Sequence, residues 1–256
     1  MRCTTLVFVF ACTIGCTSIG FAADLPIKAL PYKAPAVTAY NWAGFYLGGH
    51  IGGGWSTTNL TNTVSGGAVG WPDLAPGQSI GYRQTGIVGG GHIGINFQNG
   101  SWVYGLELSA SGANINGDAT TVPGPPFSAG DDVFSSKIRA LLLATGRLGY
   151  AWDRTLLYAK GGYAGASIRT SVADTICPAF LPVNCGSGSD SNWRSGFTVG
   201  TGLEYALANN WIAGFEYDYF RLGSGSVNLG DVNAAYIFND AARNVHLLLG
   251  RVSYKF

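Results

Sequence analysis

The C-terminal segment of the chain alternates between two kinds of side chain and ends on an aromatic residue. Back from the end, the even positions hold Phe256, Tyr254, Val252, Gly250, Leu248 and His246, whereas the odd positions hold Lys255, Ser253, Arg251, Leu249 and Leu247. Successive side chains of a β-strand point to opposite faces, so this segment can present an apolar face and a charged face. An apolar face that ends on an aromatic residue suits a bilayer, where aromatic residues gather at the interface. A strand of a soluble sandwich alternates in the same way, so other features must decide.

The start of the chain has the pattern of a secretory signal. Arg2 precedes an apolar stretch over Leu6–Ile19, and the small residues Gly20 and Ala22 precede Ala23. This order of charge, apolar stretch and small residues predicts a signal peptide over 1–22, cleaved after Ala22 or Ala23. A lipoprotein signal at Cys16 is the rival interpretation, although Thr13 stands where that signal has a bulky aliphatic residue.

The composition narrows the fold class. Hydrophobic residues make up 47% of the chain, charged residues only 11%, and glycine occurs 39 times, with a formal net charge of +1. After the signal there is no run of about 20 apolar residues, which a membrane helix would need. A closed β-barrel is the other way for a chain to cross a bilayer. The absence of a basic run argues against nucleic acid as a partner.

The remainder of the chain divides into eight alternating segments. They are Phe45–Trp55, Gly86–Phe97, Trp102–Ser111, Lys137–Tyr150, Leu156–Ala166, Ser195–Tyr205, Trp211–Phe220 and Asn244–Phe256. Segments of about 10 residues match tilted strands that cross the hydrocarbon layer. Three short turns, at 98–101, 152–155 and 206–210, alternate with four long polar stretches, at 56–85, 112–136, 167–194 and 221–243.

This pattern predicts an all-β domain over 43–256, a transmembrane eight-stranded antiparallel up-and-down β-barrel. In the outer membrane of a Gram-negative bacterium, the long loops of such a barrel lie outside the cell and its short turns lie in the periplasm. We therefore expect extracellular long loops and two periplasmic termini in the mature chain.

One parity of these strands collects charged side chains, and we expect it to face the lumen. The residues are Glu107, Arg139, Arg147, Lys160, Glu204, Glu216, Asp218 and Arg251. An eight-stranded barrel is just wide enough for side chains to fill. Buried charges persist only when they are paired and hydrogen-bonded. The sequence therefore predicts an ion-pair network that plugs the lumen, with an ion-conducting lumen as the alternative.

Three histidines remain in the mature chain. If the first two strands pair as a hairpin without an offset, residues whose numbers sum to about 142 lie opposite each other. This pairing brings His50 and His92 together in the lumen. Paired imidazoles can bind a transition metal or haem iron. The alternative is that both are polar fillers, and we expect no resident metal or cofactor. His246 faces outward without a serine on its face, so no catalytic triad forms and we expect no enzymatic activity.

Two cysteines remain after the signal is removed. An even pair in an exported protein predicts a disulfide, here between Cys177 and Cys185 within a polar loop. Closing so short a loop stabilises by roughly 2–3 kcal/mol at most, and the effect is local.

A proline-rich linker is predicted over 23–42. Pro26, Pro31 and Pro35 favour an extended, semi-rigid tether through the periplasm. An arm that touches peptidoglycan or a protein partner is the alternative.

Several motifs resemble one family. They are Ala23–Pro26, Tyr40–Gly49, Gly146–Ala151, Thr198–Tyr205 and Val252–Phe256. With these motifs the chain resembles the small, porin-like outer-membrane immunogenic proteins of alphaproteobacteria. The resemblance implies an outer-membrane location and a structural and surface-antigen role without enzymatic activity. It also implies that the barrel-assembly machinery, with periplasmic chaperones, reads the last strand, in which Tyr254 and Phe256 are the assembly signal.

The function expected from the sequence is therefore envelope integrity and surface presentation. Outer-membrane lipids and lipopolysaccharide are expected partners, and a homo-oligomer is possible for such a barrel. The alternatives are a narrow passive channel for ions or small solutes, and a lumen or loop that binds a ligand such as haem.

Overall fold

The structure is a computed structural model that describes residues 40–66, 74–122, 132–175, 187–229 and 235–256. The whole of the predicted signal, residues 23–39 of the predicted linker, and both Cys177 and Cys185 lie outside the described residues. The strands are β1 (Gly44–Gly66), β2 (Ser79–Asn99), β3 (Trp102–Thr120), β4 (Asp132–Trp152), β5 (Thr155–Asp174), β6 (Ser187–Ala206), β7 (Trp211–Leu222), β8 (Gly225–Asn228), β9 (Ala235–Asp240) and β10 (Arg243–Lys255). In this described part no helix is long and apolar enough to cross a membrane.

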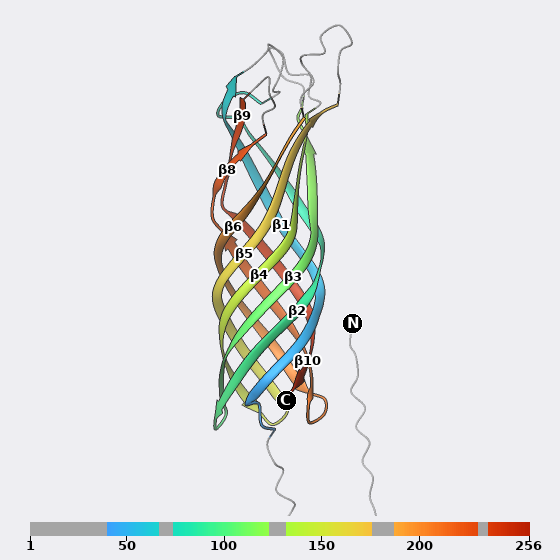
Figure 1. Ribbon diagram of the computed structural model, residues 1–256, viewed down its shortest axis with the longest axis vertical. Helices are drawn as coiled ribbons and strands as arrows, with labels where there is room; N and C mark the ends of the chain where they lie inside the picture. The colour runs from blue at the N-terminus through green and yellow to red at the C-terminus, as the bar shows by residue number, and fades with distance from the viewer. Residues whose placement is uncertain (1–39, 67–73, 123–131, 176–186, 230–234) are drawn as a thin grey trace, which may run out of the picture. The chain divides into compact units, whose positions relative to one another are not determined.

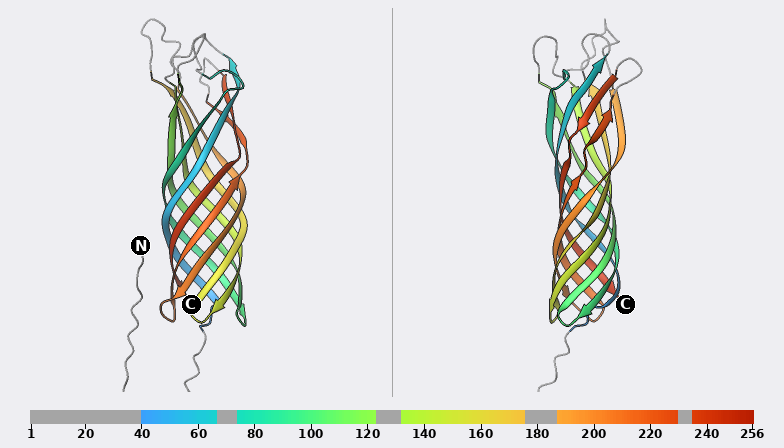
Figure 2. Two further views of the ribbon diagram at one scale, coloured as in Figure 1. Left: turned by 180° about the vertical axis from the view of Figure 1, so that it is seen from behind. Right: turned by 90° about the vertical axis from the view of Figure 1, so that its left-hand side faces the viewer.

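Eight of the strands form a closed ring. Each of β1 to β7 pairs with its neighbour in sequence, β7 pairs with β10, and β10 pairs with β1. All of these pairings are antiparallel (Figures 1 and 2). The short turns and the C-terminus lie at one end of the barrel, here called the turn end, and the opposite end is the loop end. The prediction of an eight-stranded up-and-down barrel is confirmed.

Six of the strands, β1 to β6, are much longer than the sequence predicts, whereas β7 and β10 have about the predicted length. β1 has 23 residues and β2 to β6 have 19 to 21, whereas 9–11 residues suffice for a tilted strand to cross a bilayer. Much of the four expected loops is therefore strand, and this expectation was wrong. In the segment expected to be the last loop, β8 and β9 form a hairpin. β9 pairs with β1 on the loop-end side of the point at which β10 begins.

The outer wall changes character along the barrel. Near the turn end the outward side chains are large and apolar, such as Phe45, Leu148 and Phe215, each more than half exposed. Near the loop end they are polar, such as Asn59 and Arg83. Exposed apolar side chains over so wide a surface require an apolar solvent, so the turn-end half of the barrel is the part that fits a bilayer.

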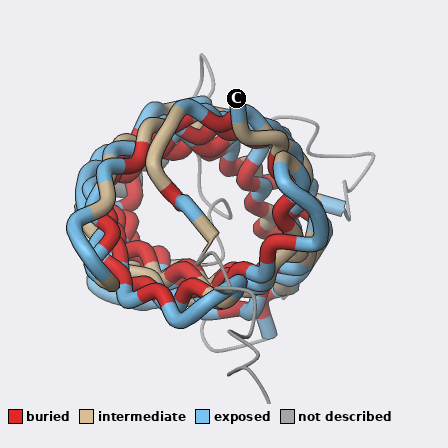
Figure 3. Tube along the Cα trace, turned by 90° about the horizontal axis from the view of Figure 1, so that it is seen from below, coloured by how far each residue is buried: buried red, intermediate tan, exposed pale blue. Residues whose placement is uncertain are grey.

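The interior changes in the opposite sense. Near the turn end it holds buried charges, whereas near the loop end it holds an apolar cluster of Leu60, Tyr82, Phe134, Val172, Val227, Leu229 and Phe238. Figure 3, seen from the turn end, shows buried positions on the inside of the ring and exposed positions on the outside. The loop-end half therefore has the polarity of a water-soluble barrel. A pattern search for apolar outward positions misses such strands, which explains why they were expected to be loops.

This division predicts opposite tolerances on the two halves of the outer wall. Leu148→Arg places a charge in the apolar band and is expected to destabilise the inserted barrel by about 2–4 kcal/mol. Asn59→Arg, on the outward face of the loop-end half, is expected to change stability little. Urea unfolding from lipid vesicles measures both, and equal tolerance of the two arginines would contradict the division.

Candidate functional site

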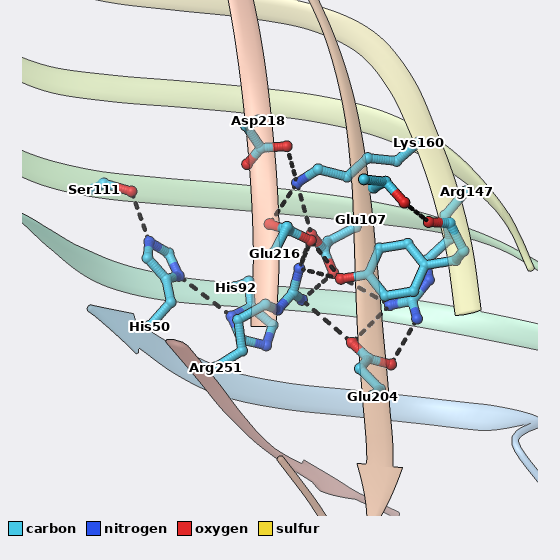
Figure 4. A network of polar contacts seen from close by, with 12 residues as sticks. His50, His92, Glu107, Ser111, Arg147, Lys160, Glu204, Glu216, Asp218 and Arg251 are labelled. Carbon is cyan, nitrogen blue, oxygen red and sulfur yellow. Dashed lines mark hydrogen bonds and ion pairs between the residues drawn. The ribbon is translucent and has the colours of Figure 1, made fainter. Parts of the chain in front are cut away.

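Seven of the eight charged residues predicted to face the lumen meet inside the turn-end half of the barrel. They are Glu107 on β3, Arg147 on β4, Lys160 on β5, Glu204 on β6, Glu216 and Asp218 on β7, and Arg251 on β10. All seven are buried, and Figure 4 shows them pointing toward one another from different strands. We call this set the lower polar layer.

Arg147 is held by acids and aromatic rings on three sides. Its Nη2 lies 2.7 Å from Glu204 Oε2, and its Nη1 lies 3.5 Å from Glu107 Oε2. Nη1 also donates to the Tyr46 hydroxyl at 3.0 Å, and that hydroxyl donates to Glu107 at 2.9 Å. The guanidinium lies 4.0 Å from the centre of the Tyr158 ring, a cation–π distance. The charge is therefore paired and stacked as burial requires.

Arg251 and Lys160 connect the remaining acids. Arg251 donates to Glu107 and to Glu216. Lys160 Nζ lies 2.7 Å from Glu216 Oε1 and 3.1 Å from Asp218 Oδ1. The carboxylates of Glu107 and Glu216 thus each pair with more than one cation. The layer therefore forms a single connected network across the lumen.

Arg139 is the exception, and the prediction that it faces the lumen was wrong. A β-bulge interrupts the pairing of β4 with β5 between Ile138 and Ala140, so the side-chain parity changes there. Leu141 and Arg147 below the bulge point inward, whereas above it Ile138 is the buried residue and Arg139 is exposed. Four acids of the lower polar layer therefore face three bases and not four.

The two histidines lie beside this layer on adjacent strands, and the expected meeting is confirmed. His50 Nδ1 is 3.3 Å from His92 Nδ1, and the rings stack with centroids 5.6 Å apart. Their register differs slightly from the expectation, because His50 pairs with Gly90 and the facing positions sum to 140. The outer ring nitrogens contact Ser111 Oγ at 2.7 Å and Ser253 Oγ at 2.8 Å.

Every ring nitrogen of the pair thus has a polar protein atom within hydrogen-bond distance. Within the described ranges no group of three or more His, Cys, Asp or Glu side chains could hold a metal ion. The geometry favours the interpretation of His50 and His92 as polar fillers, since a metal would have to break the chain from Ser111 to Ser253.

A second polar layer lies nearer the loop end, and the sequence did not reveal it. Arg243 Nη2 lies 2.8 Å from Asp240 Oδ2, and Arg194 Nη2 lies 3.5 Å from the same oxygen. Arg243 Nη1 donates to Ser136 Oγ at 2.9 Å, and Gln84 Nε2 donates to the Ser136 carbonyl at 2.8 Å. Asp240 and Arg243 had been assigned to a loop. The inward parity of Arg243 with Arg251 in the last segment was the signal that could have found it.

A second apolar cluster, distinct from the one near the loop end, occupies the lumen between the two polar layers. It consists of Val88, Ile115, Ile138, Leu141, Leu143, Ala164, Ala166, Ile168, Phe220, Leu222, Val245, Leu247 and Leu249. On β10, Val245, Leu247 and Leu249 lie between Arg243 of the second polar layer and Arg251 of the lower one. Charged and apolar layers therefore alternate along the barrel axis.

A residue from the expected linker packs into the turn-end mouth of the barrel. Trp42 is fully buried and packs in a cluster with Val103, Ala151, Leu156, Tyr158, Ala206 and Ile212. Its backbone N–H donates to Gln98 Oε1 at 2.7 Å. Figure 3 shows the chain ahead of β1 turning inward across the mouth. The last residues of the predicted linker, 40–42, thus pack with the barrel.

A closed ring of eight antiparallel strands with an apolar outer band and charges inside is now established. Residues 29–256 match the family model described as outer membrane protein beta-barrel domain. The chain belongs to this family of outer-membrane β-barrel proteins.

Relatives support the same family. The 25 kDa outer-membrane immunogenic protein of Brucella abortus is 30% identical over 229 residues, 88% of this chain and 87% of the relative. The 31 kDa outer-membrane immunogenic protein of Brucella melitensis is 27% identical over 245 residues, 92% of each chain. The 22 kDa outer membrane protein of Rhizobium leguminosarum is 29% identical over 206 residues, 77% of this chain and 76% of the relative. The expected resemblance to outer-membrane immunogenic proteins is confirmed.

Solved structures are more distant. The outer membrane protein OprG from Pseudomonas aeruginosa has a TM-score of 0.43 at 14% identity, covering 84% of this chain and 96% of OprG. The outer membrane protease OmpT from Escherichia coli has a TM-score of 0.48 at 10% identity, covering 85% of this chain and 98% of OmpT.

Two arginines of this outer-membrane barrel offer a matched test of the lower polar layer. Arg251→Leu leaves Glu107 and Glu216 short of a buried partner, so we expect the free energy of unfolding to fall by about 3–5 kcal/mol. Arg139→Leu removes an exposed charge and is expected to change it by less than about 0.5 kcal/mol. Urea titration of the folded barrel in detergent compares the two, and the reverse order would place Arg139, not Arg251, in the network.

Proposed function

We propose that this outer-membrane barrel is a structural envelope protein with a closed lumen, which presents its loop end to the outside of the cell. The observation that carries the proposal is the layered interior. From the turn end, the Trp42 cluster is followed along the axis by the ion pairs of the lower polar layer and then by the apolar cluster that contains Leu247. An interior filled in this way favours a structural role over solute passage.

The interior offers little that favours a channel or an enzyme. A conducting pathway would have to pass both an apolar layer and a network of mutually paired charges. His50 and His92 each contact a serine through one ring nitrogen. The other ring nitrogen of each contacts the other histidine and not an acid, so neither histidine forms a Ser-His-acid triad. We therefore propose that the protein has no enzymatic activity.

The proposed orientation follows from the two ends of the barrel. The C-terminus and the short turns share the turn end, and the turn end carries the apolar band. The loop-end half has a polar outer wall that suits water, so we place it outside the cell and both mature termini in the periplasm. The predicted Cys177–Cys185 bridge would then lie outside the cell.

The last strand supports assembly as an outer-membrane barrel. The Tyr254 ring packs edge-on against Trp211 and against Phe256, with centroids 5.2 Å and 5.1 Å apart. The Phe256 ring itself is mostly exposed, although its N–H donates to the Phe45 carbonyl at 2.9 Å. A terminal aromatic with so few contacts fits the proposal that the barrel-assembly machinery reads it.

A deletion strain tests this function. Loss of the protein is expected to sensitise cells to detergents and to large antibiotics, and the full chain is expected to restore resistance. A chain without Phe256 is expected to restore less, because less of it inserts, as outer-membrane fractionation with heat-modifiable gel migration will show. Unchanged sensitivity of the deletion strain would contradict the envelope role, and normal insertion without Phe256 would contradict the assembly signal.

A further inference from the structure

The bulge in β4 gathers cations on the outer wall. It leaves Arg139 exposed two residues from Lys137, which is also exposed, and Lys137 pairs directly with the exposed Arg169 of β5. Like charges directly opposite each other on neighbouring strands destabilise a sheet. Three cations on two adjacent strands are therefore unfavourable unless an anion lies between them.

None of these cations has an acidic partner in the part of the chain that the structure describes. The ion pairs of the described residues involve Arg147, Lys160, Arg194, Arg243 and Arg251, all of them buried. Among the described residues these three cations make one side-chain hydrogen bond, which Arg169 Nη2 donates to Ser189 Oγ at 3.1 Å. The other strand neighbour of Lys137 is Asn116, which carries no charge.

The cations lie directly above the apolar band. Leu142, three residues after Arg139 toward the turn end, is exposed about 10 Å along the strand from it. Trp193 of β6 is half exposed and pairs with Ser167, two residues from Arg169. The Trp193 indole donates to the Tyr163 hydroxyl at 3.2 Å, an arrangement that suits the membrane interface. The order from apolar to aromatic to cationic residues matches hydrocarbon, interface and headgroups.

Among the residues that the structure describes, the opposite wall of the barrel has no such concentration of cations. On β1, β7 and β10 the corresponding belt consists of Trp55, stacked on His246 at 5.3 Å, with Tyr217 and Tyr219 beside it. Arg221 is the one exposed cation among the described residues of β7. The cations on β4 and β5 are thus a local feature and not part of an even ring around the barrel.

We propose that Lys137, Arg139 and Arg169 bind the anionic headgroup of an outer-leaflet glycolipid. Its acyl chains would lie along the apolar wall below, and its phosphate or sugar carboxylate groups would lie between the cations. Two guanidinium groups and an ammonium suit a multivalent anion, because arginine binds phosphate and carboxylate through two parallel hydrogen bonds. This site rests on the proposed function only in requiring the loop end to face outward.

The amount of glycolipid that copurifies with the barrel tests the site. The variant with Lys137→Gln, Arg139→Gln and Arg169→Gln is expected to retain about tenfold less lipopolysaccharide per barrel than wild type, measured by native mass spectrometry. The matched control, Arg83→Gln with Arg221→Gln, removes two exposed arginines on other strands and is expected to retain the wild-type amount. Heat-modifiable migration shows that each variant is folded.

Adding lipid back to the lipid-free, refolded barrel distinguishes phosphate from carboxylate as the bound anion. Intact lipopolysaccharide is expected to bind wild type, and either phosphatase treatment or carboxyl reduction of that lipid is expected to weaken binding, which identifies the anion. The reference is the binding of intact lipopolysaccharide to wild type. The site would be overturned if both treated lipids or phosphatidylglycerol bound wild type as well as this reference, or if the triple variant bound intact lipopolysaccharide as well as wild type does. A wild-type barrel with its loop end in the periplasm, detected by labelling of whole cells at an introduced cysteine, would overturn the proposed orientation instead.

Discussion

The hydrogen-bonded closure between β1 and β10 is the constraint on which the rest of the structure depends. Twelve residue pairs, from Tyr46 with Lys255 to Thr57 with Asn244, join the first strand to the last. Closure removes the sheet edges, which a bilayer would not tolerate. It also fixes an interior so narrow that inward charges from different strands must meet. Arg251 of β10 reaches Glu107 of β3 only because the sheet is closed, whereas Glu216 lies on the neighbouring strand β7.

Closure leaves the barrel to satisfy two solvents with one alternating pattern. In the turn-end half the outward positions are apolar and the lower polar layer lies inside, whereas in the loop-end half the outward positions are polar and the interior holds an apolar cluster besides the second polar layer. The exchange takes place near the bulge in β4, where the parity of the strand changes. The bulge changes which positions of β4 face inward, whereas on β2 the buried positions keep one parity from Tyr82 to Asn96.

The sequence predicted the part of the fold in which outward residues are apolar. Strand centres, the up-and-down order, seven inward charges and the meeting of His50 with His92 followed from alternation alone. Arg139 did not, because the extra residue of a bulge leaves no local signature in composition. The loop-end strands were missed because polar outward positions resemble loops. The pair of Asp240 and Arg243 was missed for the same reason. Trp42 was missed because its partners lie on strands far away in the sequence.

The proposal of a closed lumen separates this barrel from a channel, so conductance is the measurement that tests it most directly. Folded wild-type protein reconstituted in a planar bilayer is expected to show no discrete current steps, because paired charges, apolar side chains and Trp42 occupy successive levels of the lumen. The heat-modifiable form on gels, recovered from the same membranes, establishes that the barrel is inserted. Reproducible single-channel steps from that inserted protein would contradict a lumen closed by its own side chains.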